Sequence, residues 1–288
     1  MGPTETSHHP RNSLLVATNA IEEITATAQR VRRHIIRMVT EVNSGHAGGS
    51  LSAVEILCAL YFGTMRHDPK RPDWPERDRF IMSKGHATPV YYSVLAEAGY
   101  FPTDELLTFR KLNSRLQGHP RINTAPGIEM SSGSLGQGLA FSIGQLFAAR
   151  LDGLDYRLYC LLGDGECQEG QVWESMMCAP YHGLSNLCAI IDRNGIQNDW
   201  FVKDTMELEP LDDKLAAFGW HVISTDGHDV RSLFDAFDEA KGVSDKPTAI
   251  IAKTVKGKGV SFMENNPDFH GKAPSPEQAE QALKEIGE

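Results

Sequence analysis

Cysteine is scarce in this sequence of 288 residues, and its five cysteines lie singly within apolar or helical stretches, at positions 58, 160, 167, 178 and 188. Since no CxxC pair occurs, the sequence gives no sign of zinc or disulfide chemistry, and we expect reduced core residues. Long apolar runs are also missing: none approaches the roughly 20 residues of a membrane span. The polar start MGPTETSHHPRNS lacks the apolar core of a secretory signal, so we expect a cytoplasmic protein.

Positive charge is in the minority, with 28 Lys and Arg against 38 Asp and Glu and a formal net charge of −10. Nucleic acid or an anionic membrane would be repelled by such a surface, so we expect neither as a partner. Two basic clusters occur, RVRRHIIR and KTVKGKG. The first alternates with apolar residues at helical spacing, which predicts the solvated face of a helix.

Nothing in the sequence marks an internal domain boundary, because we find no repeat and no low-complexity linker. The length and the 41% hydrophobic content suffice for a sizeable core. We therefore expect a flexible tail over residues 1–18 and a single domain over residues 19–288. His8 and His9 fall in that tail, where we expect disorder and no metal binding.

Three helices can be placed from their patterns. Apolar residues at steps of three and four predict one long amphipathic helix from Asn19 to about Val42. A second helix is expected to begin where Ser52 and Glu55 form an S-x-x-E capping box and to run through AVEILCALYF. The segment SPEQAEQALKEIGE, with Ser275 as N-cap and a proline next, predicts a short closing helix.

Five short apolar or β-branched runs alternate with helical patterns along the rest of the chain: RFIM, YRLYCLL, LCAIID, WHVIST and TAIIAKT. Strands that are apolar throughout and are separated by single helices are typical of a parallel sheet that is covered on both faces. We therefore predict an α/β fold with an open, mostly parallel sheet and helices on both faces.

Ligands of such sheets bind beyond the carboxyl ends of the strands, so the residues that follow each run are informative. GDG follows YRLYCLL, RNGI follows LCAIID, and Asp164 and Asn194 stand one strand–helix–strand unit apart. If the strands are neighbours, the carboxylate, the amide oxygen and a backbone carbonyl near Ile196 form a partial ligand set for Mg²⁺, which phosphate and water would complete. Either turn alone is more often a plain turn, but the pair favours a metal diphosphate site.

Glycines support the same reading. Gly163 and Gly165 flank Asp164 and would let backbone N–H groups approach a phosphate closely. A second cluster, SSGSLGQG, places Gly133 and two further glycines before a helix. Its order is G-x-x-G-x-G and not the dinucleotide order G-x-G-x-x-G, so it is a weak Rossmann signal but a reasonable cofactor turn.

Four of the eleven histidines lie beside glycine in loops: His46, His86, His119 and His270. Each alone is more often a structural loop histidine. Together they indicate a pocket lined with imidazole, which could bind hydroxyls and transfer protons near neutral pH. His228, in DGHDV, has the same appearance, although a capping or turn role is at least as good an interpretation.

At this point the motifs resemble a known family. GDGECQEG followed by DRNGIQND is similar to the thiamin diphosphate motif in the form used by transketolases. SGHAGGSLS, SKGHA, GSLGQG, GHP and HGKAP occur in the order expected of a transketolase's diphosphate-binding domain, and the resemblance covers roughly residues 20–274. It implies a thiamin diphosphate-binding fold with thiamin diphosphate and Mg²⁺ as cofactors.

The resemblance also implies roles for particular residues. Asp164, Asn194 and the carbonyl of Ile196 would bind Mg²⁺, with Gly165 and His270 near the diphosphate. His46, His86 and His119 would line the channel where the ketose donor meets the cofactor. The implied cofactor contacts are Gly133, Leu135, Gly163, Asp164, Gly165, Glu166, Asn194, Ile196 and His270.

Glu169 and Glu174 match carboxylates that reach across the family's subunit interface and couple two active sites. The alternative is an exposed first helical turn, where acidic residues are favoured anyway.

The resemblance stops short of a whole transketolase, because the pyrimidine-binding and C-terminal domains have no counterpart in this sequence. The activating glutamate and the arginines that hold substrate phosphate belong to those domains. Ser134, where the family usually has proline, marks a departure near the donor pocket.

We therefore expect the N-terminal subunit of a split transketolase that moves a two-carbon ketol unit from a ketose or its phosphate to an aldose. A C-terminal subunit would be its partner, in a dimer of heterodimers.

Three rival functions stay open at this level. The α subunit of a 2-oxo acid dehydrogenase shares the GDG-to-asparagine motif, although SGHAGG and SKGHA favour transketolase. A non-catalytic regulatory subunit could retain the fold, but the complete set of metal and histidine positions argues against it. A nicotinamide dehydrogenase is disfavoured by the glycine order.

Overall fold

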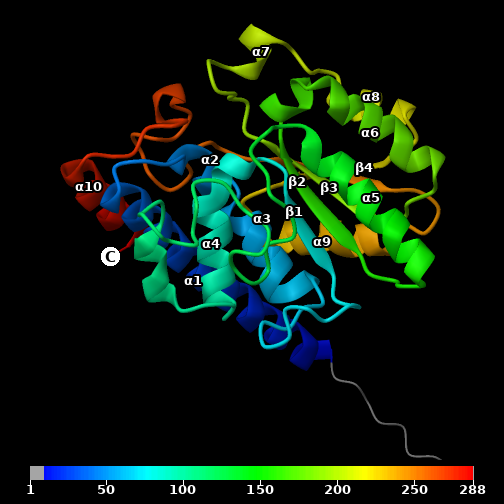
Figure 1. The fold of residues 1–288 in the computed structure, drawn as a ribbon, viewed down its shortest axis with the longest axis horizontal. Coiled ribbons are helices and arrows are strands. Elements are labelled where there is room, and N and C mark those ends of the chain that lie inside the picture. The colour runs from blue at the N-terminus through cyan, green and yellow to red at the C-terminus, as the bar shows by residue number, and fades with distance from the viewer. Residues whose placement is uncertain (1–9, 288) are drawn as a thin grey trace, which may run out of the picture.

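A single five-stranded parallel sheet forms the centre of the molecule (Figure 1). The computed structural model describes residues 10–287, and their side chains from residue 20 onward. The strands are β1 (Arg79–Met82), β2 (Leu158–Gly163), β3 (Leu187–Arg193), β4 (His221–Asp226) and β5 (Thr248–Lys253). Their order is β1-β2-β3-β5-β4, and every neighbouring pair is parallel. The predicted open parallel α/β fold is confirmed.

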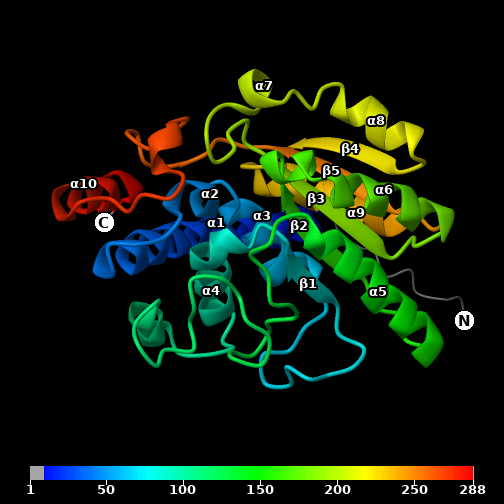
Figure 2. The same ribbon diagram turned by 45° about the horizontal axis from the view of Figure 1, so that its top comes forward.

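Helices cover both faces of this sheet, and in β2 alternate residues point to opposite layers. Tyr159 and Leu161 belong to one hydrophobic core, and Cys160 and Leu162 belong to the other. Figure 2 shows α5, α6 and α8 on one side and α1 and α3 on the other, and the core residues of α9 belong to the same layer as those of α1 and α3. The helices are α1 (Pro10–Glu41), α2 (Ala47–Leu51), α3 (Val54–Ala59), α4 (Thr88–Glu97), α5 (Gln137–Asp152), α6 (Gly170–Tyr181), α7 (Val202–Thr205), α8 (Leu211–Ala217), α9 (Val230–Gly242) and α10 (Pro276–Ile286).

The first helix begins earlier than its apolar pattern predicted. Helix α1 starts at Pro10 instead of Asn19, so residues 10–18, which we assigned to a flexible tail, continue the helix. Periodicity locates only the part of a helix that packs on the core, and among the side chains described, from residue 20 onward, Ile24 is the first core residue of α1. His8 and His9 lie outside the described residues.

The predicted capping box at Ser52 is wrong. The N-cap of α3 is Ala53, and Ser52 Oγ instead donates to the Asp192 carboxylate at 2.6 Å and to the carbonyl of Gly49. Glu55 lies inside α3, where its side chain pairs with Arg32. Both side chains of the motif therefore bind partners that are distant in the sequence, Asp192 and Arg32, and do not form the local hydrogen bonds of a capping box.

Other predicted local features are confirmed. Ser275 and Gln278 form a complete capping box at the start of α10. The cysteines are all free, and only Cys178 is not fully buried. Within residues 10–287, no helix has the length and apolar character needed to cross a membrane.

Glu55 is the centre of a buried charge network that ties α1, α3 and the turn after β4 together. Its carboxylate accepts from both terminal nitrogens of Arg32 and lies 2.9 Å from His228 Nδ1. Nε2 of His228 in turn accepts from the backbone N–H of Val255. Burial opposes ionisation, but the His228 hydrogen bond and the Arg32 charge lower the pKa of Glu55 to about 2. Arg32 is therefore an exception to the solvated basic face that RVRRHIIR predicted.

Replacing Glu55 by Gln should destabilise the chain strongly, because it leaves the buried Arg32 guanidinium without its counter-charge. We expect the free energy of unfolding at neutral pH to fall by about 3–5 kcal/mol, measured by urea denaturation. The folded pKa of Glu55 lies below the ordinary value of 4.5. Its stabilisation is therefore complete above that pH and is lost as the pH falls towards 2, and the variant should lack this acid-dependent component.

Glu41→Gln is the matched control, because Glu41 pairs with Lys111 where both side chains are about 45% exposed. Exposed pairs contribute about 1 kcal/mol or less, so this variant should unfold almost like the wild type. Equal losses in the two variants would contradict the importance of the buried network.

Candidate functional site

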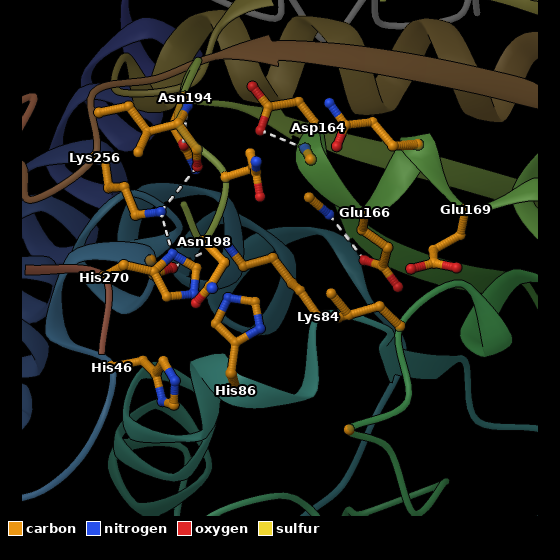
Figure 3. A pocket seen from close by; sticks show the side chains of 18 residues that line it. His46, Lys84, His86, Asp164, Glu166, Glu169, Asn194, Asn198, Lys256 and His270 are labelled. Carbon is orange, nitrogen blue, oxygen red and sulfur yellow. Dashed lines mark hydrogen bonds between the residues drawn. The ribbon is translucent and has the colours of Figure 1, made fainter. Parts of the chain in front are cut away.

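The carboxyl ends of four strands meet at a pocket of about 410 Å³, which is within the size range of small-molecule sites (Figure 3). Each strand end contributes residues: Lys84 after β1, Asp164 after β2, Asn194 after β3 and Lys256 after β5. The lining residues are His46, Gly49, Lys84, His86, Gly133, Leu135, Gly163, Asp164, Gly165, Glu166, Gln168, Glu169, Asn194, Ile196, Gln197, Asn198, Lys256 and His270. All the predicted cofactor positions are in this set.

Asp164 and Asn194 lie side by side, as the spacing predicted. In the register of β2 and β3, Gly163 is opposite Asp192, so the two turns follow neighbouring strands. Asp164 Oδ2 accepts from Gly195 N at 2.6 Å, and Asn194 Oδ1 accepts from Ile196 N at 3.1 Å. The two turns are therefore linked by a direct hydrogen bond.

The electrostatics around Asp164 suit a cation. Its carboxylate is 3% exposed, and its hydrogen bonds among the described residues come from the backbone N–H groups of Gly165 and Gly195. Burial and the nearby charge of Asp192 raise the pKa of Asp164 to about 6. A cation beside this carboxylate would relieve both effects.

The carbonyl of Ile196 accepts a hydrogen bond from Lys256 Nζ at 2.8 Å. Carboxylate, amide and carbonyl oxygens are the ligands Mg²⁺ prefers, and this contact shows that the carbonyl oxygen is within reach of a side chain that lines the pocket. Within the described residues no cluster of three or more His, Cys, Asp or Glu could hold a metal. A metal here would thus depend on this mixed set of oxygens.

Two buried lysines, which the motif analysis overlooked, contribute amines to the pocket. Lys84 and Lys256 are 1% and 2% exposed. Burial and the charge of Lys84 lower the pKa of Lys256 to about 7. Buried amines beside the glycine-rich turn at Gly165 are suited to a diphosphate, whose negative charge would offset theirs. The residues therefore fit both an anionic group and a cation.

Asp192 was also overlooked, although it ends the run LCAIID. It is fully buried and forms an ion pair with Lys84. Burial works against its charge, yet Lys84 and the hydroxyls of Ser52 and Thr254 hold its pKa below the usual range. Examining the residues after all five strands, and not only after two, would have found Lys84 and Lys256. The role of Asp192 follows only from the fold, because its donors Ser52, Lys84 and Thr254 are distant in the sequence.

Glu166 fastens two loops of the pocket together. Its Oε1 accepts from Ser83 Oγ and from the backbone N–H of Gly136 at 2.9 Å, and its Oε2 accepts from Gly163 N at 3.0 Å. The SSGSLGQG turn is therefore held against the end of β2. The close approach of this turn to Ser83 also requires glycine at position 138, because a Cβ there would lie 2.4 Å from the Ser83 side chain.

The four loop histidines do gather in one place. The ring of His46 lies 5.2 Å from that of His86, 5.5 Å from that of His270 and 6.4 Å from that of His119. His46, His86 and His270 line the pocket, whereas His119 is exposed beside Gly133. The prediction that these residues share one region is confirmed, and their catalytic roles stay a prediction.

These imidazoles are neutral at physiological pH. Burial and the charge of Arg110 lower the pKa of His46 to about 4, and burial and Lys256 lower that of His270 to about 3. Burial and Lys84 lower the pKa of His86 well below its usual value. Nδ1 of His46 is buried and has no hydrogen-bond partner within the described part of the chain. Nδ1 of His270, by contrast, lies 2.6 Å from Lys256 Nζ. A neutral ring with an unpartnered nitrogen, as in His46, is suited to binding a sugar hydroxyl.

The remaining predicted residues differ in their positions. Glu169 is exposed and borders the pocket, and Glu174 is exposed further along α6 without lining it. Their predicted role across a subunit interface involves a second chain and stays a prediction. His228 lies outside the pocket and has the structural role described above. Three lining residues gave no sequence signal that we used: Gln168, Gln197 and Asn198.

Comparison with known proteins identifies the family. Residues 24–287 match the family described as transketolase, thiamine diphosphate binding domain. The 6-deoxy-6-sulfo-D-fructose transketolase subunit SqwG of Clostridium sp. (strain MSTE9) is 41% identical over 259 residues, which are 90% of this chain and 94% of that protein. An apulose-4-phosphate transketolase subunit of Actinobacillus succinogenes is 42% identical over 268 residues, 92% of this chain and 96% of that protein.

Relatives named simply transketolase are also similar, but the chain spans less than half of their length. Human transketolase is 42% identical over 267 residues, which are 92% of this chain and 42% of the human protein. The crystal structure of transketolase from Campylobacter jejuni superimposes with a TM-score of 0.87 at 36% identity, covering 93% of this chain and 43% of that one. The chain therefore belongs to the transketolase family, of which it has the thiamine diphosphate-binding domain.

Proposed function

We propose that this chain is the thiamine diphosphate- and Mg²⁺-binding subunit of a two-chain transketolase. With a separate C-terminal subunit, it would transfer a two-carbon ketol unit from a ketose or ketose phosphate to an aldose. A dimer of heterodimers is the arrangement we propose for the assembly. A cytoplasmic location stays a prediction of the sequence.

One observation carries the proposal: a pocket that could hold a metal diphosphate and a sugar occurs in a chain as long as known transketolase subunits. The relatives named as subunits match over 94% and 96% of their own length, whereas human transketolase matches over 42%. In the pocket, two buried lysines and the buried carboxylate of Asp164, which a cation would stabilise, lie beside a group of neutral imidazoles.

The chain's own residues would hold the cofactor in two parts. Asp164, Asn194 and the Ile196 carbonyl would bind Mg²⁺, and Lys84 and Lys256 would offset the charge of the diphosphate. When bound, thiamine diphosphate supplies an electron sink for breaking the carbon–carbon bond of the ketose. Lys256 now donates to Ile196, so it would have to exchange this carbonyl for phosphate oxygens when Mg²⁺ binds.

The histidines would bind and orient the sugar. The free Nδ1 of His46 could accept from or donate to a hydroxyl, depending on its tautomer. His86 and His270 lie with their ring centres 5.2 Å apart, so hydroxyls on neighbouring carbons could reach both rings. A neutral imidazole at such a hydroxyl can also take up its proton as a carbonyl forms there, and the resulting imidazolium can return that proton when a carbonyl is consumed.

Mixing this chain with its partner subunit should produce ketol transfer that neither chain shows alone. The partner candidate would come from the adjacent reading frame, and the assay would contain thiamine diphosphate, Mg²⁺ and a panel of ketoses and aldoses. Asp164→Ala should lower the rate of the mixture by roughly 100-fold or more, because it removes a charged metal ligand directly. Product formation would be followed by chromatography.

The possible results separate the rival functions. Turnover by this chain alone would refute the two-chain proposal. A mixture that binds the cofactor but transfers nothing from any ketose would redirect the search to 2-oxo acids, the substrates of the related dehydrogenase subunits. Failure to bind the cofactor even with the partner would favour a regulatory subunit.

Lys256→Met should weaken thiamine diphosphate binding by about tenfold or more, the effect of losing one charged hydrogen bond. Isothermal titration calorimetry of the two-chain complex with Mg²⁺ would measure the dissociation constant. Lys258→Met is the control, because Lys258 belongs to the same loop but its amine lies 3.6 Å from Glu264 and does not line the pocket. If both variants bind like the wild type, Lys256 does not hold the diphosphate.

A further inference from the structure

We propose that Asp192 is a positioning residue, which turns the side-chain amide of Asn194 so that its oxygen, and not its nitrogen, faces the cation. The inference rests on the proposed Mg²⁺ site and adds to it a residue that does not touch the metal. It follows from the hydrogen bonds around a fully buried carboxylate at the end of β3.

Asp192 receives donors from four separate segments of the chain. Its Oδ2 accepts from Ser52 Oγ at 2.6 Å, from the Lys84 amine and from Asn194 Nδ2 at 3.3 Å. Its Oδ1 accepts from Thr254 Oγ1. These donors come from the α2–α3 junction and from the residues that follow β1, β3 and β5, so the carboxylate is fixed from several directions.

An asparagine side chain has two ends of almost equal shape, but only its oxygen can bind a metal. The ionised carboxylate of Asp192 can only accept hydrogen bonds, so it attracts the NH₂ end of Asn194 and repels the oxygen end. The oxygen end accepts from Ile196 N on the opposite side, which favours the same orientation. The asparagine therefore presents its oxygen to the pocket.

The same contacts explain why Asp192, only two residues away, is not itself a metal ligand. Its Oδ2 already accepts from three donors, and its Oδ1 accepts from Thr254 Oγ1. Lys84 also offsets its charge inside the protein. A carboxylate whose two oxygens are both engaged in this way orients its neighbour and leaves Asp164 as the one acidic ligand of the proposed set.

Exchanging the two side chains tests the inference directly. Asp192→Asn gives position 192 an amide that no longer selects one end of Asn194. We expect Mn²⁺ affinity, in the presence of thiamine diphosphate and the partner subunit, to fall roughly 10- to 100-fold.

The double variant Asp192→Asn with Asn194→Asp should recover most of that loss. In the double variant, the carboxylate at position 194 has two equivalent oxygens, and the amide at position 192 can donate to one of them.

Asn194→Asp alone makes a third test, which does not require Asp192→Asn to fold. It provides a stronger ligand but sets two carboxylates against each other without a donor between them, so we expect weaker Mn²⁺ binding than in the wild type. Binding is read from the electron paramagnetic resonance signal of free Mn²⁺, which does not depend on turnover. Circular dichroism checks that each variant is folded.

Ser52→Ala is the matched control. It removes one donor to the same Oδ2 but leaves the Asn194 contact intact. We expect a lower melting temperature and Mn²⁺ affinity close to that of the wild type.

Unchanged Mn²⁺ binding in folded Asp192→Asn would overturn the inference, and so would tighter binding in Asn194→Asp. A folded double variant that binds as weakly as Asp192→Asn would overturn it as well, because a merely structural role predicts no rescue. If the wild-type complex itself fails to bind Mn²⁺, the proposed metal site is wrong and the inference falls with it. That result is recognisable because it occurs before any substitution is made.

Discussion

The parallel pairing of the strands is the constraint on which the rest of the structure depends. Because β1, β2, β3 and β5 all run in the same direction, their carboxyl ends deliver Lys84, Asp164, Asn194 and Lys256 to a single edge. The register that sets Gly163 opposite Asp192 then decides that the two turns share a hydrogen bond. Without this alignment, the same residues would be isolated polar groups at the ends of apolar runs.

Gathering so many charges under the surface costs free energy, and the site is arranged to limit that cost. Asp192 is neutralised by Lys84 and three further donors, and Glu166 is satisfied by a hydroxyl and two backbone N–H groups. Burial still raises the pKa of Asp164 and of Glu166 and lowers that of Lys256. All three side chains line the pocket, so the remaining cost of burial falls where a cation and an anion would bind together.

Much of this could be predicted from the sequence, and the omissions share a cause. Apolar runs gave all five strands, and the residues after two of them gave Asp164 and Asn194. Lys84 and Lys256 were missed because the residues after only two of the strands were considered. Asp192 was missed because its pairing with Lys84 requires β1 and β3 to flank β2, an order that no local pattern contains. Ser52 was misinterpreted as a cap because its true partner is 140 residues away. Sequence motifs such as a capping box predict a residue's hydrogen bonds correctly only where its partners are neighbours in the sequence, as at Ser275.

The distribution of exposure across the site bears on the two-chain proposal. The groups that we propose to hold the metal diphosphate are buried and hydrogen-bonded within this chain. His119 and Glu169, which border the same region, are exposed. A second subunit that covered them would shut water out of the pocket and strengthen the contacts of the neutral histidines beneath. Buried groups for the proposed cofactor and exposed groups beside them are the division expected if a partner supplies the rest of the active site.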